Sequence, residues 1–153
     1  MNGPVAVAKL ISMLLLAIAG YTGFAVPKQH PEISFLPRGE LQERFCGWPC
    51  PIRAYFPPGS TIYLEQGMVV FHDPASESIL VHELTHWMQQ ANLAHSVAQN
   101  CQEWLDREYQ AFDVQYRWLP GGRGKLLGFL ACRSSSLARP PAGACRSGTA
   151  MAP

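Results

Sequence analysis

The chain lacks two cysteine patterns that have a defined chemistry. It has no Cys-x-x-Cys pair of the kind found in redox centres and zinc knuckles, because three residues separate Cys46 from Cys50. No cysteine ends the N-terminal apolar run, which argues against a bacterial lipoprotein anchor. We therefore expect the five cysteines to be structural, in disulfides of an oxidising compartment, with at least one left free or paired between chains. A bridge from Cys101 to Cys46 or Cys50 is one such pairing.

A strong net charge is also missing, since the 153-residue chain carries only +1. This near-neutral total hides two regions of opposite charge. Residues 27–119 hold eleven acidic and six basic side chains, whereas the chain after residue 120 is basic and has no acidic residue. Residues 131–153 are dominated by Ser, Ala, Pro, Gly and Arg. We predict a disordered, solvated basic tail over 131–153 and no nucleic-acid partner, with an anionic surface as the alternative partner of the tail.

The N-terminal segment is almost wholly apolar from Leu10 to Ala19, and Lys9 is the one basic residue before it. Small residues in Ala17-Ile18-Ala19 stand where signal peptidase requires them. Residues 1–25 are therefore predicted to be a signal peptide, and the protein to be secreted or periplasmic. The alternative is an uncleaved membrane anchor, the one case in which a membrane is a partner.

The string His82-Glu83-Leu-Thr-His86 lies in a stretch with helical apolar spacing. On a helix, residues four apart share a face, so both imidazoles can bind one metal ion while Glu83 reaches a metal-bound water. Asp73-Pro74 supplies a helix cap and a first-turn proline, which predicts a helix from there to about Ala94.

A third ligand must come from elsewhere. A metzincin would need Gly and His where this chain has Gln89 and Asn92, so that class is excluded. The next helical stretch, 101–119, presents Glu108 from an apolar stripe, where a carboxylate is costly unless a cation meets it. Asp106 lies off that stripe, and Glu103 remains the alternative ligand.

His82-Glu83-x-x-His86 followed by Glu108-x-x-Ala111 resembles the gluzincin metallopeptidases, in particular their short single-domain members of unknown function. The resemblance covers about residues 60–119. It implies zinc bound by the two histidines and Glu108, with Glu83 as the general base.

The chain departs from the gluzincin pattern at Phe112, where many members carry an Asp or Asn that orients a ligand histidine. We expect Asp113, Gln115 or a backbone carbonyl to take over that role, or a looser site.

The ligand set predicts a secreted zinc metallopeptidase that hydrolyses peptide bonds of a peptide or protein substrate, with Glu83 passing a proton from zinc-activated water to the leaving amine. A further side chain is expected to assist the oxyanion, from Tyr109, Tyr116, His72 and His95. The alternative is a secreted, zinc-stabilised binding or regulatory module without catalysis.

The fold expected is α+β and mostly helical, a minimal zincin-like domain over 59–130. It would contain the two helices and a small antiparallel hairpin of 61–65 with 68–71, joined by Gln66-Gly67, one edge of which could pair with a substrate backbone. Residues 26–58 are predicted to be a Pro-rich loop segment with a short helix over 40–45.

Overall fold

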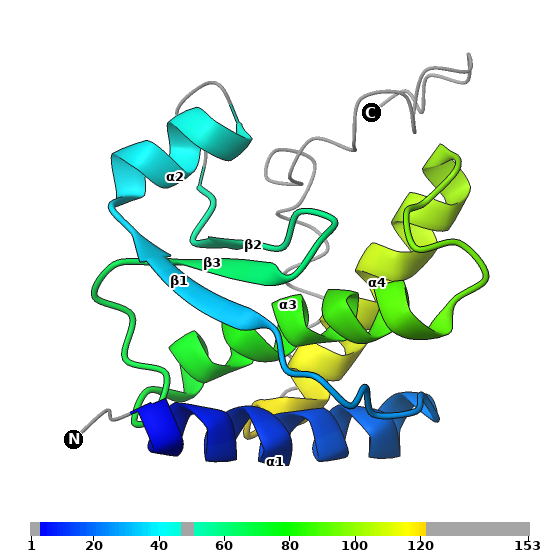
Figure 1. The fold of residues 1–153 in the computed structure, drawn as a ribbon, viewed down its shortest axis with the longest axis horizontal. Coiled ribbons are helices and arrows are strands. Elements are labelled where there is room, and N and C mark those ends of the chain that lie inside the picture. Colours follow the sequence, from blue (N-terminus) through cyan, green and yellow to red (C-terminus); the bar gives the residue numbers. More distant parts are fainter. Residues whose placement is uncertain (1–3, 47–50, 122–153) are drawn as a thin grey trace.

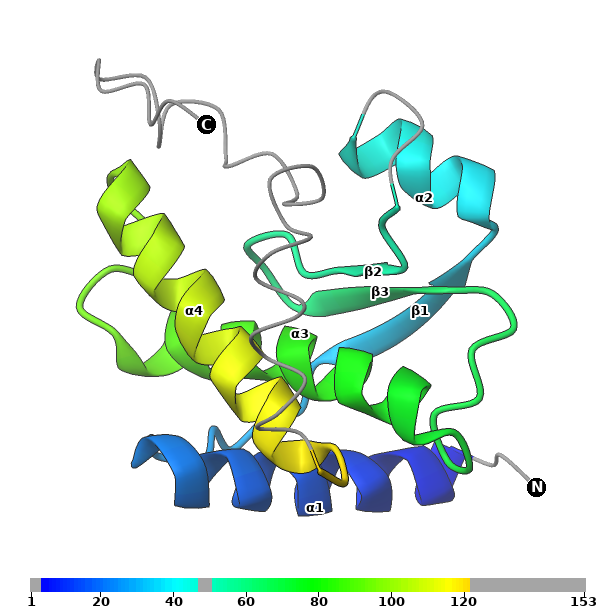
Figure 2. The same cartoon turned by 180° about the vertical axis from the view of Figure 1, so that it is seen from behind.

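Helix α3 (Pro74–Asn92) is the central element of the protein, whose computed structural model describes residues 4–46 and 51–121. The remaining elements are α1 (Pro4–Thr22), β1 (Glu32–Leu36), α2 (Arg38–Phe45), β2 (Ala54–Tyr55), β3 (Thr61–Glu65) and α4 (Cys101–Trp118). The sheet lies on one side of α3, helix α1 lies on the opposite side, and α4 crosses α3 (Figures 1 and 2). The described residues thus form a mixed α+β fold that is mostly helical, as predicted.

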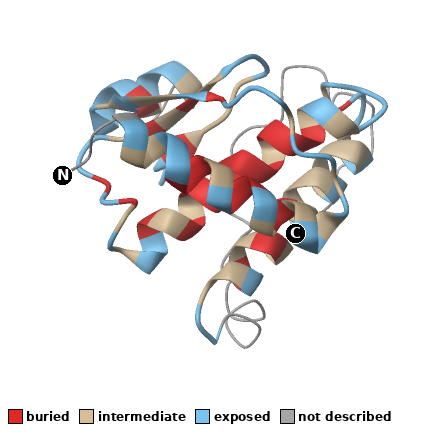
Figure 3. Cartoon of the chain, turned by 60° about the horizontal axis from the view of Figure 1, so that its bottom comes forward, coloured by how far each residue is buried: buried red, intermediate tan, exposed pale blue. Residues whose placement is uncertain are grey.

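The start of α3 follows from its sequence. The Asp73 carboxylate accepts hydrogen bonds from the backbone N–H groups of Ala75 and Ser76, and Pro74 occupies the first turn, where no N–H is needed. The helix ends at Asn92, two residues before the predicted end. Eleven of its nineteen residues are buried (Figure 3), so α3 must be covered on several sides.

The sheet has the order β1-β3-β2, with β1 parallel and β2 antiparallel to the central strand β3. Ile62 and Leu64 of β3 are fully buried and belong to the same apolar cluster as Leu80 and Leu84 of α3. Alternate residues of a strand face opposite sides, so this pattern turns one face of β3 toward the helix.

The prediction of a hairpin is wrong for its second strand, residues 68–71. Residues 68–71 form a turn and irregular chain, and β3 pairs instead with β1 and β2 from upstream. The Gln66-Gly67 turn forms, with Gly67 at a φ of +93°, but the backbone N–H of Asp73 then bonds to the Val69 carbonyl and leads straight into α3. Strand β3 is therefore paired along both of its edges, and neither edge is free for a substrate backbone.

Residues 26–58 contain more regular structure than the predicted loop segment, because β1, α2 and β2 all lie there. The short helix expected over 40–45 is confirmed as α2 and begins slightly earlier, at Arg38. The predicted tail, 131–153, and three of the cysteines, Cys50, Cys132 and Cys145, lie outside the described residues, so the cysteine pairing stays a prediction.

Helix α1 is long and apolar enough to cross a membrane, and no other helix of the described residues meets this criterion. A signal sequence or an anchor would both pass this test. In the structure, however, one side of α1 is part of the hydrophobic core, where α1 packs against α3 and α4. The buried residues of this side are Leu10, Ile11, Leu14, Leu15 and Ile18. Its other side exposes apolar residues, among them Val5 and Leu16.

Candidate metal centre

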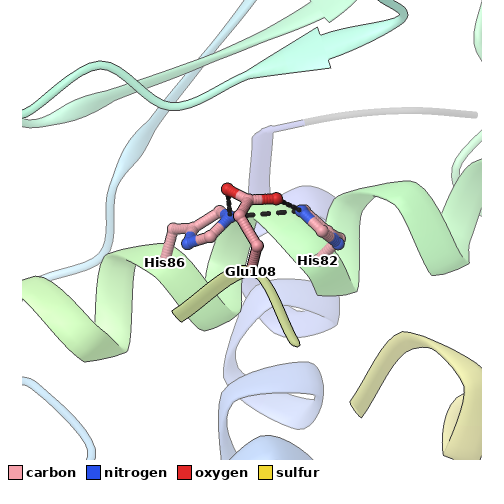
Figure 4. Close-up of side chains that lie close together, drawn as sticks. All are labelled: His82, His86 and Glu108. Atoms are coloured by element: carbon pink, nitrogen blue, oxygen red, sulfur yellow. Dashed lines mark hydrogen bonds and ion pairs between the residues drawn. The ribbon is translucent and has the colours of Figure 1, made fainter. Parts of the chain in front are cut away.

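Three side chains from two helices converge on one point (Figure 4). His82 and His86 lie one turn apart on α3, and Glu108 reaches them from α4; one ligand atom from each lies within 4.8 Å of the others. The two Nε2 atoms are 3.1 Å apart. The Glu108 carboxylate lies 3.6 Å from Nε2 of His82 and 3.1 Å from Nε2 of His86.

The packing of α4 against α3 positions Glu108. Asn100 caps α4 by accepting the backbone N–H of Glu103, and Ala111, Phe112 and Val114 are buried one turn or more beyond Glu108. The Phe112 ring centroid lies 4.1 Å from that of His82, so the carboxylate enters the site beside an apolar side chain.

Glu103, the alternative third ligand, lies elsewhere. It sits in the first turn of α4, where its carboxylate accepts the backbone N–H of Gln99 and lies 3.6 Å from Nδ1 of His95. Among the described residues, Glu108 and not Glu103 joins the two histidines as a group that could hold a metal ion.

Charge and burial act in opposite directions on these groups. Burial opposes ionisation of Glu108, but the neighbouring His86 and His82 overcome it and hold the pKa of this carboxyl well below its usual range. Burial likewise opposes a charged His86, yet the Glu108 carboxylate raises the pKa of His86 to about 9. In the metal-free protein a proton on His86 therefore balances the charge of the Glu108 carboxylate, and a bound metal cation would replace that proton.

The far side of each imidazole meets a glutamine. Nδ1 of His82 lies 3.1 Å from Oε1 of Gln115, and Nδ1 of His86 lies 2.8 Å from Oε1 of Gln89. An oxygen at Nδ1 places the proton of a neutral imidazole on Nδ1 and leaves Nε2 as a lone pair. When both rings are neutral, the two Nε2 lone pairs face each other and the Glu108 carboxylate, so three acceptors converge without a donor.

These residues fit a zinc ion. Two imidazole nitrogens and one carboxylate oxygen are a donor set of catalytic zinc sites, in which bond lengths of about 2.0 to 2.2 Å in a tetrahedron separate the donor atoms by about 3.3 to 3.6 Å. The separations of 3.1 and 3.6 Å are close to that spacing. The chemistry of three convergent acceptors carries the fit.

Glu83, the predicted base, is 7 % exposed and interacts electrostatically with His82, His86 and Glu108. Burial raises its pKa, the two histidines lower it in part, and Glu108 raises it further. The backbone of Phe56, just after β2, hydrogen-bonds to the Glu83 carboxylate and favours its charged form. The carboxylate is thus held between α3 and the chain that leaves the sheet.

The side chains expected to assist an oxyanion are scattered. Tyr109 is 57 % exposed and His95 lies beside Glu103. Tyr116 is buried on α4, and the ring of His72 contacts Phe71 just before α3.

Tyr55 in β2 was missed from the sequence, although it is close enough for both site carboxylates to affect it. Burial raises the pKa of the Tyr55 hydroxyl, and the negative charges of Glu83 and Glu108 raise it further. The hydroxyl therefore stays protonated, as a hydrogen-bond donor, at neutral pH. A two-residue strand has no periodicity that could have drawn attention to Tyr55.

No family model matches the chain, and neither the curated proteins nor the solved structures contain a match to it. The functional assignment rests on the geometry and chemistry of the site.

Proposed function

We propose that the chain is a zinc-dependent hydrolase of peptide bonds, with zinc held by His82, His86 and Glu108. The observation that supports this is the convergence of three acceptor atoms from two helices beside Glu83, a buried carboxylate that belongs to no ion pair of the described residues. Zinc, when bound at such a site, lowers the pKa of a water molecule and polarises a carbonyl group.

Glu83 acts as the general base in this proposal. Burial raises its pKa toward the range in which a carboxylate accepts a proton efficiently near neutral pH. The carboxylate takes a proton from the attacking water and returns it to the leaving amine. The Phe56 backbone orients the carboxylate and favours the charged form that accepts the first proton.

The alternative is a zinc-stabilised binding or regulatory module. The low exposure of the site favours it, because the ligand side chains are only 9 to 17 % exposed and a substrate carbonyl would have to reach them. In such a module, zinc would stabilise the α3–α4 pair and Glu83 would have no chemical role.

Zinc content tests the ligand set. Purified protein should hold one zinc per chain by elemental analysis, Glu108→Ala should lose it, and the matched control Glu103→Ala on the same helix should keep it. Wild-type protein that takes up no zinc after incubation with the metal would contradict both functions.

Glu83→Gln separates the two functions. An enzyme should retain zinc and lose cleavage of a peptide library by a factor of about 100 or more, because general base catalysis is removed. A binding module should show no cleavage in the wild type, and the substitution should change neither zinc content nor fold.

We also propose that the protein is exported and keeps α1 uncleaved as part of the folded domain. The reason is that α1 supplies buried side chains to the core, which cleavage would remove. The intact mass of the protein after expression in its host compartment tests this, since loss of about 25 residues would support the cleaved signal instead.

A further inference from the structure

Two glutamine side chains contact the imidazoles of His82 and His86 at Nδ1, the ring nitrogen that faces away from the candidate metal position. The inference drawn from these contacts rests on the zinc site proposed above. An amide oxygen and an amide nitrogen have similar shapes, so the orientation of a glutamine must be read from its partners. The partners of Gln89 allow one orientation, and those of Gln115 favour one.

Gln89 is held by acceptors from α4. It is 1 % exposed, and its Nε2 donates to the Arg107 carbonyl and to Oε1 of Gln110, both at 2.9 Å. A backbone carbonyl cannot donate, so the nitrogen of Gln89 must point toward α4. Its oxygen must then face Nδ1 of His86.

Gln115 is held from α3 in the reciprocal way. Its Nε2 donates to Oγ of Ser78 at 3.2 Å. The Ser78 hydroxyl donates its own proton to the Ala75 carbonyl at 2.7 Å and therefore presents a lone pair to Gln115. In this arrangement the oxygen of Gln115 faces Nδ1 of His82.

We propose that Gln89 and Gln115 are positioning residues that set the protonation of the two ligand histidines. Each holds a proton on Nδ1, keeps Nε2 free for the metal, and fixes the ring orientation. Both partners are neutral amides. Asp113, which the sequence also offered for this role, forms an ion pair with Arg117 at 2.8 Å instead.

The two positions should respond differently to a carboxylate. In Gln115→Glu the second oxygen would meet a hydroxyl, which can rotate and donate to it. In Gln89→Glu the second oxygen would meet the Arg107 carbonyl, which cannot adapt. We therefore expect Gln115→Glu to bind zinc at least as tightly as the wild type, because a carboxylate makes the imidazole more basic, and Gln89→Glu to bind it more weakly.

Zinc affinity, measured by competition with a chromophoric chelator, tests the proposal. Gln89→Met and Gln115→Met should each weaken zinc binding by about 10- to 100-fold, the usual effect of losing such a partner. Gln90→Met and Gln102→Met are matched controls on α3 and α4, since these glutamines bond to Gly59 and Asp106 and not to a histidine. The controls should bind zinc as the wild type does.

Rescue separates positioning from packing. If Gln115→Met weakens binding and Gln115→Glu restores it, the hydrogen bond to His82 matters; if both weaken it equally, Gln115 only fills space and the proposal fails. Unchanged affinity in both methionine variants would also overturn it. Should Gln89→Met fail to fold, the Gln115 series still decides.

A second measurement does not depend on zinc. In nitrogen-15 spectra of metal-free protein at alkaline pH, His82 and His86 should show the Nδ1–H tautomer, and Gln115→Met should shift His82 toward the Nε2–H form. Wild-type rings in the Nε2–H form would overturn the positioning proposal. Wild-type rings in the Nδ1–H form, in protein that binds no zinc, would instead overturn the proposed function alone.

Discussion

Helix α3 meets its neighbours through two different kinds of contact. Toward α1 and the sheet it presents apolar side chains that share one core, including Leu80, Leu84 and Met88. Toward α4 it presents histidines and a glutamine whose partners are carboxylate and amide groups. Apolar contacts depend mainly on buried area and tolerate changes of shape, whereas the polar contacts depend on which atom carries each proton. The first kind should govern folding, and the second metal binding.

The largest effect is expected on the apolar side. Leu14→Asp would place a charge at a fully buried position of α1 and should destabilise the protein by about 4 kcal/mol or more, or prevent folding. Leu16→Asp is the control, two residues away and 65 % exposed, and should change stability by about 0.5 kcal/mol or less. Urea unfolding measures both. Equal effects would mean that α1 does not pack on the core in solution.

Zinc should stabilise the protein only through the polar contact between α3 and α4. With free zinc at about 100 times its dissociation constant, unfolding should cost about 2.7 kcal/mol more than in metal-free protein. Thermal unfolding with and without zinc, compared with the same pair in Glu108→Ala, measures this gain. A gain that survives in Glu108→Ala would place the metal elsewhere.

Without zinc, the polar contact between α3 and α4 should make the free energy of unfolding depend on pH. The pKa of His86 is raised to about 9 in the folded state, above its usual 6.5, so its contribution is fully present below pH 6.5 and is lost as pH rises through about 9. Glu108, with a lowered pKa, contributes above its usual 4.5 and loses its contribution as pH falls through the folded value. We expect a loss of about 1 to 3 kcal/mol between pH 6.5 and 9 in metal-free protein. Glu108→Gln should flatten this dependence, and an unchanged slope would contradict the pairing.

The smallest effect is expected at the surface of α4. Asp113 and Arg117 form an ion pair whose side chains are 48 and 38 % exposed. Asp113→Ala should change stability by about 0.5 kcal/mol or less and leave zinc affinity unchanged, because solvent screens such pairs. Weaker zinc binding in this variant, by chelator competition, would give Asp113 the orienting role that we assign to Gln115.

The parts predicted well from the sequence are those that depend on neighbours along the chain. The start of α3 follows from Asp73-Pro74, and the shared face of His82 and His86 follows from the helical period. Glu108 was predicted as the third metal ligand because it lies on an apolar stripe. This local pattern requires a cationic partner for the carboxylate but does not identify it. Gln115 was one of three candidates, because two positions on α4 and any nearby carbonyl could have reached the ring.

The parts missed depend on contacts between distant segments. Gln89 lies one turn after His86 and could have been noticed by spacing, but only the Arg107 carbonyl shows which way its amide points. The pairing of β3 with β1 and β2 was missed because residues 68–71 have strand-like composition and lie nearer in sequence.

The sequence by itself determined the chemistry of α3, since the four-residue spacing of two histidines with a glutamate between them is set by the geometry of one helix. The tertiary structure decided the rest. It brought Glu108 to that face, directed two amide oxygens at the far sides of the rings, and packed an apolar N-terminal helix into the core. The reason is physical, because hydrogen bonds and burial between segments far apart in the chain depend on the packing of the whole domain, and no local period encodes them.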